Sequence, residues 1–240
     1  MTTQFDLIAL GGGSAGLAVA EIAAQLGKKV AIIEPHRLGG TCVNQGCVPK
    51  KIMWYAAQLA HAAEDAEHFG IPVQRGTTDW NKLVSNRENY ISHINTYWHN
   101  YVKENNIRLI EGHGRFISPH EVEVNGEKLS AQHIVIATGG RPIVPDIPGS
   151  EKAITSDGFF ALKQQPKNVA VIGGGYIAVE LAGMLNALGS NVSLFMRDEC
   201  PLKRCDALLC EVLLSEMRKQ GIQLQKLKST RLMAIIKKFA

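Results

Sequence analysis

The sequence predicts an α/β fold in which one strand–turn–helix–strand pattern occurs twice. The first copy begins with FDLIAL, a run of β-forming residues that leads directly into the glycine-rich stretch GGGSAG. The second copy occupies residues 167–197, where NVAVI is followed by GGG, a helical pattern and the apolar run NVSLFM. Strands that alternate with helical patterns in this way favour parallel sheets whose faces are covered by helices.

The spacing of apolar residues places the next elements along the chain. After the first glycine turn, residues 14–26 have helical spacing and residues 28–34 form a second strand pattern. Two long helix patterns follow at 50–69 and 79–106. Asp79 stands where the N-cap of the second of these helices is expected.

Short strand patterns then lead to a proline-rich connection. They lie at 107–118, 121–126 and 133–140, with a turn predicted at Asn125-Gly126. The stretch RPIVPDIPGSEKAITSD that follows contains three prolines and a Pro-Gly pair, which is typical of an inter-domain connection. We therefore expect a first domain over residues 1–145, a linker over 146–166 and an incomplete second domain over 167–240.

The composition is that of an ordinary globular protein, with 45% hydrophobic and 20% charged residues. The net charge of +4 arises at one end, because seven of the 26 basic residues and none of the acidic residues lie between Met217 and Ala240. Nucleic-acid binding requires a domain-wide basic surface, so we expect no nucleic-acid partner. The N-terminus has no signal-peptide pattern and no apolar run approaches the roughly 18 residues of a membrane span, so we expect no membrane association and a cytoplasmic location.

Gly11, Gly13 and Gly16 form a G-x-G-x-x-G pattern between the first strand and the first helix. The glycines permit a tight turn and let a pyrophosphate approach the N-terminus of the helix. Glu34, at the end of the next strand, can accept hydrogen bonds from a ribose. A purely structural glycine turn is the alternative, but the strand, the helix and the distal acid together predict a Rossmann-like dinucleotide-binding unit.

Gly173, Gly175 and Ala178 repeat this pattern, and here the second strand ends at Arg197 where the first ends in an acid. An arginine can pair with a 2′-phosphate that an acid would repel, so the second unit is predicted to bind NADP. Lys203 is close enough in sequence to add positive charge, and the alternative is that both cations are solvated surface residues. Two such units on one chain imply two cofactors, or one cofactor that passes electrons to another.

Cys42 and Cys47 lie in GGTCVNQGCVPKK, between paired glycines and a helix pattern. Helix-terminal N–H groups and the following Lys50 and Lys51 would favour a thiolate there. A zinc site needs two further ligands and an iron–sulfur site needs a following C-x2-C, and the sequence has neither nearby. The pair is therefore predicted to be redox-active, and no metal is expected.

Three further cysteines, Cys200, Cys205 and Cys210, are spaced five residues apart. This spacing would scatter them around a helix, so we interpret them as ordinary buried or incidental thiols and not as metal ligands.

These segments together resemble a known enzyme family. GGGSAG, GGTCVNQGCVPKK, ATGGRP and GGGYIAVELAG are similar to motifs of the FAD- and NADPH-dependent pyridine nucleotide-disulfide oxidoreductases. Within that family, the IMW after the lysine pair and SDGFFAL at 156–162 most resemble the glutathione reductases. The resemblance runs from Phe5 to Leu224 and implies NADPH-dependent reduction of glutathione disulfide.

The resemblance also implies roles for individual residues. NADPH on the second unit would pass a hydride to FAD on the first, and the reduced flavin would open a Cys42–Cys47 disulfide. Cys47 resembles the thiolate that faces the flavin, and Cys42 resembles the thiolate that attacks glutathione disulfide. Lys50 is implied to lie near the flavin with Glu180 as its ion-pair partner, and Tyr176 to shield the flavin until nicotinamide enters. The residues implied to contact FAD are Gly11, Gly13, Ser14, Gly16, Glu34, Thr41, Thr138 and Gly139.

Members of the family continue beyond the parts that this sequence matches. They complete the NADPH domain and end in a dimerisation domain, which makes them homodimers. We therefore expect a C-terminally truncated member whose second unit is incomplete and whose dimerisation domain is absent. The alternatives are an inactive remnant that retains at most FAD and NADPH binding, or a reductase of another disulfide.

Overall fold

A computed structural model describes residues 3–227 and divides the chain into two compact units. The first unit comprises Met1–Lys50 and Asn86–Arg141, and the second comprises Lys51–Ser85 and Pro142–Ala240. Two of the divisions fall inside the long helices α3 (Cys47–Asp65) and α4 (Trp80–Glu104). Each of these helices therefore contributes residues to both units.

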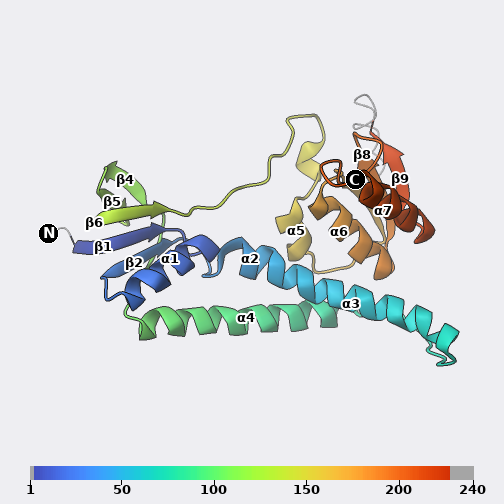
Figure 1. Ribbon diagram of the computed structural model, residues 1–240, viewed down its shortest axis with the longest axis horizontal. Helices are drawn as coiled ribbons and strands as arrows, with labels where there is room; N and C mark the ends of the chain where they lie inside the picture. Colours follow the sequence, from blue (N-terminus) through green and yellow to red (C-terminus); the bar gives the residue numbers. More distant parts are fainter. Residues whose placement is uncertain (1–2, 228–240) are drawn as a thin grey trace. The chain divides into compact units, whose positions relative to one another are not determined.

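The first unit is built on a six-stranded sheet with the strand order β3-β2-β1-β6-β5-β4 (Figure 1). The first four strands of this order pair in parallel, and β5 and β4 extend the sheet with antiparallel pairing. Helix α1 (Ser14–Gln25) connects β1 to β2, so the first copy of the sequence pattern forms a β–α–β unit as predicted. The strands are β1 (Thr3–Leu10), β2 (Val30–Glu34), β3 (Arg108–Glu111), β4 (Arg115–Ser118), β5 (Glu121–Val124) and β6 (Glu127–Ile136).

Two clusters of buried side chains cover the two faces of this sheet. Successive side chains of a strand point to opposite faces, and accordingly Ile8 belongs to one cluster and Ala9 to the other. Helix α1 packs on the Ala9 face through Leu17 and Ala20. All five residues of β2 are buried, which explains why VAIIE is apolar except for its last residue.

The second unit contains a parallel three-stranded sheet with the order β7-β8-β9. Helix α6 connects the first two strands, and α7 connects the second to the third. The elements are α5 (Ser156–Ala161), β7 (Asn168–Ile172), α6 (Tyr176–Ala187), β8 (Asn191–Met196), α7 (Ala207–Lys219) and β9 (Gln223–Lys226). Their apolar side chains share one core with Met53 and Ala57 of α3 and Trp80 and Val84 of α4.

Two local predictions are confirmed by the backbone. The Asp79 Oδ1 atom accepts a hydrogen bond from the Lys82 N–H at 3.0 Å, so Asp79 caps α4 as expected. Asn125 and Gly126 have φ angles of 51° and 81°, the left-handed conformations of a tight hairpin turn, and they join β5 to β6.

The segment around the cysteine pair is more helical than the sequence indicates. A six-residue helix, α2 (Gly40–Gln45), precedes α3, and α3 itself begins at Cys47 instead of residue 50. At its other end, α3 passes into the 3₁₀ helix η1 (Ala66–Phe69). Both cysteines of the pair are therefore helical residues.

The division into units differs from the predicted domain boundaries. The break after Arg141 lies near the predicted boundary at residue 145, but residues 51–85 group with the second unit because they share its core. The predicted linker over 146–166 contains the 3₁₀ helix η2 (Ser150–Lys152) and α5, whose phenylalanines Phe159 and Phe160 are buried in that core. No helix within residues 3–227 is both long and apolar enough to span a membrane.

Candidate active site

The first glycine turn joins β1 to α1 through close backbone contacts. Gly11 has a φ of +110°, and a Cβ at this position would lie 2.2 Å from the carbonyl oxygen of Ala137. A Cβ at Gly16 would lie 1.8 Å from the carbonyl oxygen of Gly11. Any side chain at either position would push the helix away from the strands, so both glycines are required by packing.

Gly13 occupies the N-cap position of α1 and leaves the start of the helix open. Its backbone is extended, no side chain caps the helix, and no acidic residue lies in the first turn. A Cβ on Gly13 would come within 4 Å of only one atom, the Cα of Gly40, at 3.6 Å. The first N–H groups of α1 and its positive dipole end therefore offer a place for a diphosphate, as the glycine pattern predicts.

Glu34 lies against this turn. Its side chain is 8% exposed, Oε2 accepts a hydrogen bond from the Gly12 N–H at 2.6 Å, and Oε1 accepts one from the His36 N–H at 2.8 Å. The carboxylate thus fixes the turn, and its remaining lone pairs are of the type that can accept from ribose hydroxyls. The ribose contact itself stays a prediction.

The other residues implied to contact FAD border the same turn. Thr138 follows β6, and its Cα would lie 3.3 Å from a Cβ at Gly11. Gly139 has a φ of +71° and open space around it. Thr41 is the second residue of α2, next to Gly40, where a Cβ would lie 2.7 Å from the Cα of Gly13. The fold therefore gathers these positions from three separate parts of the sequence.

Cys42 and Cys47 contact each other at the junction of α2 and α3. All five cysteines are free thiols, and the thiols of this pair lie close enough for Cys47 to raise the pKa of Cys42. Cys42 is partly buried in α2, whereas Cys47 is exposed at the first position of α3. The Ser14 hydroxyl at the start of α1 also lies near the Cys42 thiol and acts to lower its pKa. The thiol pair is thus connected directly to the first glycine turn.

The environment of Cys42 does not favour its thiolate, contrary to the expectation from the sequence. Burial raises the pKa of Cys42, and the neighbouring Cys47 raises it further. The neighbouring Ser14 lowers the pKa but does not outweigh burial. Lys51, which belongs to the second unit, has its Nζ 4.2 Å from the ring centre of Trp54.

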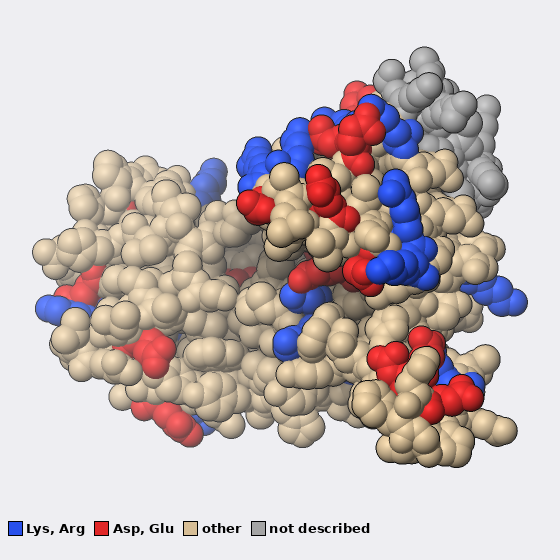
Figure 2. All heavy atoms as spheres, turned by 45° about the vertical axis from the view of Figure 1, so that its right-hand side comes forward, with Lys and Arg blue, Asp and Glu red and all other residues tan. Residues whose placement is uncertain are grey.

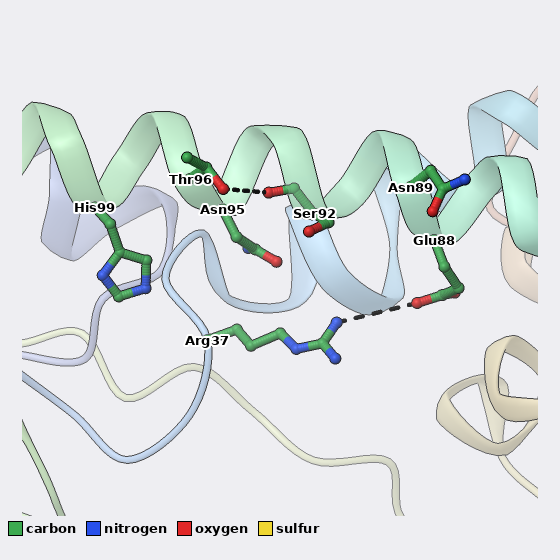
Figure 3. A pocket seen from close by; sticks show the side chains of 7 residues that line it. All are labelled: Arg37, Glu88, Asn89, Ser92, Asn95, Thr96 and His99. Carbon is green, nitrogen blue, oxygen red and sulfur yellow. Dashed lines mark hydrogen bonds and ion pairs between the residues drawn. The ribbon is translucent and has the colours of Figure 1, made fainter.

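Two asparagines that the sequence analysis missed hold α2 in place. The Asn44 side-chain amide donates to the carbonyl oxygens of Leu38 at 3.1 Å and Gly40 at 2.9 Å. Asn95 of α4 donates to the Leu38 carbonyl at 2.9 Å and to Asn44 Oδ1 at 3.1 Å. Asn95 lines a polar cavity of about 450 Å³ in the first unit, between α4 and the loop that carries Arg37 (Figure 3). In the sequence, the position of Asn44 two residues after Cys42 is the feature that could have indicated this role.

The second glycine turn resembles the first in its backbone. Gly173 has a φ of +141°, and a Cβ there would lie 3.4 Å from the Cβ of Ala178, an ordinary contact that explains why alanine suits this third position. Gly175 is the extended N-cap of α6, and a Cβ on it would meet nothing within 4 Å. Tyr176, the first residue of α6, is 67% exposed. Glu180 lies one turn further along α6, and its pairing with Lys50, which belongs to the first unit, stays a prediction.

The cations predicted to bind a 2′-phosphate follow β8. Arg197 is exposed and has no hydrogen-bond or ion-pair partner among residues 3–227. Lys203 pairs with Asp198 at 3.1 Å, and both side chains are exposed. On the face drawn in Figure 2, Lys and Arg side chains lie among Asp and Glu side chains, and exposed pairs of this kind contribute little stability. Arg197 is therefore the better-placed cation for an anionic ligand.

Comparison with known proteins decides the family. The pyridine nucleotide-disulphide oxidoreductase family matches residues 5–234. The chain belongs to this family. It is 45% identical over 227 residues to the glutathione reductase of Schizosaccharomyces pombe. This alignment covers 91% of this chain and 49% of the relative. It is 39% identical over 249 aligned positions to the glutathione reductase of Yarrowia lipolytica. This alignment covers 98% of this chain and 53% of the relative. The chain spans about half the length of the curated relatives it matches.

For this member of the pyridine nucleotide-disulphide oxidoreductase family, the predicted site residues fall into two groups. The first unit brings together the first glycine turn, Ser14, Glu34 and the two cysteines. The second unit brings together the second glycine turn and the loop after Arg197, because the Leu202 N–H donates to the Gly174 carbonyl at 2.7 Å. Within the described part of the chain, no group of histidine, cysteine and acidic side chains is arranged to hold a metal ion.

Proposed function

We propose that the two glycine turns bind FAD and NADPH, and that Cys42 and Cys47 form the redox pair of a glutathione-disulfide reductase. The observation that carries this proposal is the position of the thiol pair. Cys42 and Cys47 contact each other, and Ser14 ties Cys42 to the helix start where the first nucleotide would bind. A bound FAD would therefore lie beside a dithiol. The names of the relatives supply the substrate, glutathione disulfide.

The residues around each turn suit the proposed cofactors. The uncapped start of α1 suits the diphosphate of FAD, and Glu34 suits its ribose. The uncapped start of α6 suits the diphosphate of NADPH. Arg197, which has no ion-pair partner among the described residues, suits its 2′-phosphate. When bound, FAD would accept a hydride from NADPH and supply two electrons to the cysteine disulfide. We assign to Lys50 and Glu180 a charge pair near the flavin, and to Tyr176 the role of a movable cover.

The thiol chemistry balances with this chain's own residues. The Cys42 thiolate attacks one sulfur of glutathione disulfide, forms a mixed disulfide and expels one glutathione thiolate. The Cys47 thiolate then attacks the Cys42 sulfur, closes the Cys42–Cys47 disulfide and releases the second glutathione. The two thiol protons of the pair pass to the two glutathione thiolates. One glutathione disulfide is thus reduced for each dithiol oxidised.

This exchange can be tested by a single-turnover experiment. The purified chain is loaded with FAD, reduced anaerobically with one equivalent of NADPH, separated from excess NADPH and mixed with glutathione disulfide. We expect the flavin absorbance to bleach transiently and to recover as its two electrons pass to the disulfide, and about two glutathione molecules to be released per dithiol, from the balance above. Cys42→Ser and Cys47→Ser are each expected to prevent the second release.

The outcomes distinguish the alternatives. A chain that binds FAD but releases no glutathione from its reduced form would be a nucleotide-binding remnant. Release that occurs with a different small disulfide but not with glutathione disulfide would identify a reductase of another substrate. If Cys42→Ser released as much glutathione as the unchanged chain, Cys42 and Cys47 would not be the redox pair. Lys51→Ala is a control, because the Lys51 ammonium lies over Trp54 and has no proposed part in the exchange.

A further inference from the structure

Cys200 and Cys210, which the proposed function does not use, meet in the second unit. Cys200 lies in the loop between β8 and α7, and Cys210 lies in the first turn of α7. Cys200 lies close enough to Cys210 to raise the pKa of its thiol, and the Cys210 Sγ also contacts the carbonyl oxygen of Leu202, two residues after Cys200, at 3.2 Å. The prediction that the three cysteines lie scattered around one helix is wrong. Helix α7 begins at Ala207, so Cys200 and Cys205 precede it.

A tight turn before α7 brings the two thiols together. Leu202 has a φ of +55°, an uncommon conformation for a leucine, and the Cys205 N–H donates to its carbonyl at 2.7 Å. Asp206 then caps α7 by accepting from the Leu208 N–H at 2.9 Å. This turn and the cap lie between Cys200 and Cys210, and the Cys210 Sγ contacts the Leu202 carbonyl within the turn.

The two thiols differ in their access to solvent. Cys210 is 3% exposed, whereas Cys200 is partly exposed. Burial raises the pKa of Cys210, and the neighbouring Cys200 raises it further, so Cys210 loses its proton less readily than an exposed thiol. A reagent in solution therefore reaches Cys200 first, and Cys210 is the neighbour that can act next.

The thiol pair is connected to the second glycine turn through Leu202. The Cys210 Sγ donates to the Leu202 carbonyl at 3.2 Å, and the Leu202 N–H donates to the Gly174 carbonyl at 2.7 Å. A disulfide at Cys210 would have no S–H left to donate. Oxidation would therefore remove one of the contacts that hold the Leu202 loop against the glycine turn.

We propose that Cys200 and Cys210 form a second thiol–disulfide site, which small disulfides oxidise and which loosens the Leu202 loop when it is oxidised. The Cys200 thiolate attacks a small disulfide, forms a mixed disulfide and expels one small thiolate. The Cys210 thiolate then attacks the Cys200 sulfur, forms the Cys200–Cys210 disulfide and expels the second small thiolate. The protein loses two electrons and two protons, and the small disulfide gains them as two thiols.

The test uses the full chain with Cys42→Ser and Cys47→Ser, which leaves three of its five cysteines. Glutathione disulfide is the oxidant, and free thiols are counted after denaturation at each concentration. We expect the count to fall from three to one, with a loss of two hydrogens in mass and a peptide link between Cys200 and Cys210. This readout needs neither FAD nor NADPH, so its failure is distinct from failure of the proposed reductase activity.

Cys205→Ser in the same background is the matched control, since Cys205 is an exposed cysteine of the same loop. The link should still form in this variant and should be lost in Cys200→Ser and in Cys210→Ala. A link from Cys205 to either neighbour, or a glutathione adduct that persists on Cys200, would overturn the assignment. Far-UV circular dichroism of every variant shows whether the fold is kept.

Hydrogen exchange tests the connection to the glycine turn. The Leu202 amide, which donates to Gly174, should exchange more rapidly after oxidation, and the amides of the β7–β8 pairing should not. An exchange rate at Leu202 that is the same in the thiol and disulfide forms would show that the pair does not act on the loop.

Discussion

The Asn95 side-chain amide of α4 donates a hydrogen bond to Asn44 Oδ1 of α2 at 3.1 Å. This bond ties the short helix that carries Cys42 to α4, and the bond of Asn44 to the Leu38 carbonyl ties it to the preceding loop. A six-residue helix has little stability of its own, so these contacts determine where Cys42 lies.

Asn44→Ala should therefore affect both stability and Cys42 accessibility. Three backbone carbonyls, those of Arg37, Leu38 and Gly40, lose a donor, and we expect the free energy of unfolding to fall by about 1–3 kcal/mol. Alkylation of Cys42 by iodoacetamide should become faster. Urea denaturation and mass spectrometry of the alkylated peptide measure the two effects. Thr96→Ala is the control, because the Thr96 hydroxyl donates to the Ser92 carbonyl within α4, and equal effects in both variants would contradict the prediction.

Gly16→Ala should be among the most damaging single-methyl changes in the first unit. Its Cβ would lie 1.8 Å from a backbone oxygen that cannot move without shifting β1 or α1. We expect a loss of about 3 kcal/mol or more in the free energy of unfolding, at the upper end for overpacking. Gly76→Ala, where a Cβ meets nothing within 4 Å, should change stability little. Comparable urea midpoints for the two variants would show that the helix approach is looser than described.

Arg197→Ala should weaken NADPH binding without weakening NADH binding. A charge-assisted bond to the 2′-phosphate is worth about 1.5–3 kcal/mol, which corresponds to roughly a 10- to 100-fold rise in Kd. Lys203→Ala should have a smaller effect, because Lys203 already pairs with Asp198. Fluorescence titration with both nucleotides measures the four affinities. An unchanged preference for NADPH in Arg197→Ala would falsify the proposed phosphate contact.

The pKa of Cys42 makes the reactivity and stability of the reduced protein depend on pH. Because burial and Cys47 raise this pKa, the pH profile of Cys42 alkylation should have its midpoint above that of an unfolded cysteine. Ser14→Ala should shift the midpoint up further, and Cys47→Ser should shift it down. A thiol whose folded pKa is raised stabilises the fold below the unfolded pKa, and this contribution is lost as the pH rises through the folded pKa. A profile that does not move in Ser14→Ala would contradict the action of Ser14 on Cys42.

The parts of the fold that depend on local sequence could be predicted. The two strand–glycine–helix units, the Asp79 cap and the Asn125-Gly126 turn each rest on neighbouring residues whose backbone preferences are strong. Residue types at fixed spacing also indicated the Gly11 turn and its acid, Glu34, and the structure places the two in contact.

The parts that depend on distant contacts could not be predicted. Helix α2 has two glycines at its start and is held mainly by Asn44 and Asn95, which lie far apart in the sequence. Residues 51–85 join the second unit because Met53 and Trp80 enter its core, which no local pattern indicates. Cys200 and Cys210 lie on either side of a turn in which Leu202 adopts a left-handed conformation that its residue type disfavours.

The bonds from Glu34 to the backbone of Gly12 and His36 also bear on how fast a nucleotide can associate. A flexible glycine loop would have to lose conformational entropy each time a ligand arrived, and many encounters would end before the loop had ordered. Here a buried carboxylate already holds the loop in one shape. The proposed binding surface is preorganised, so an arriving diphosphate would meet N–H groups that are already in place.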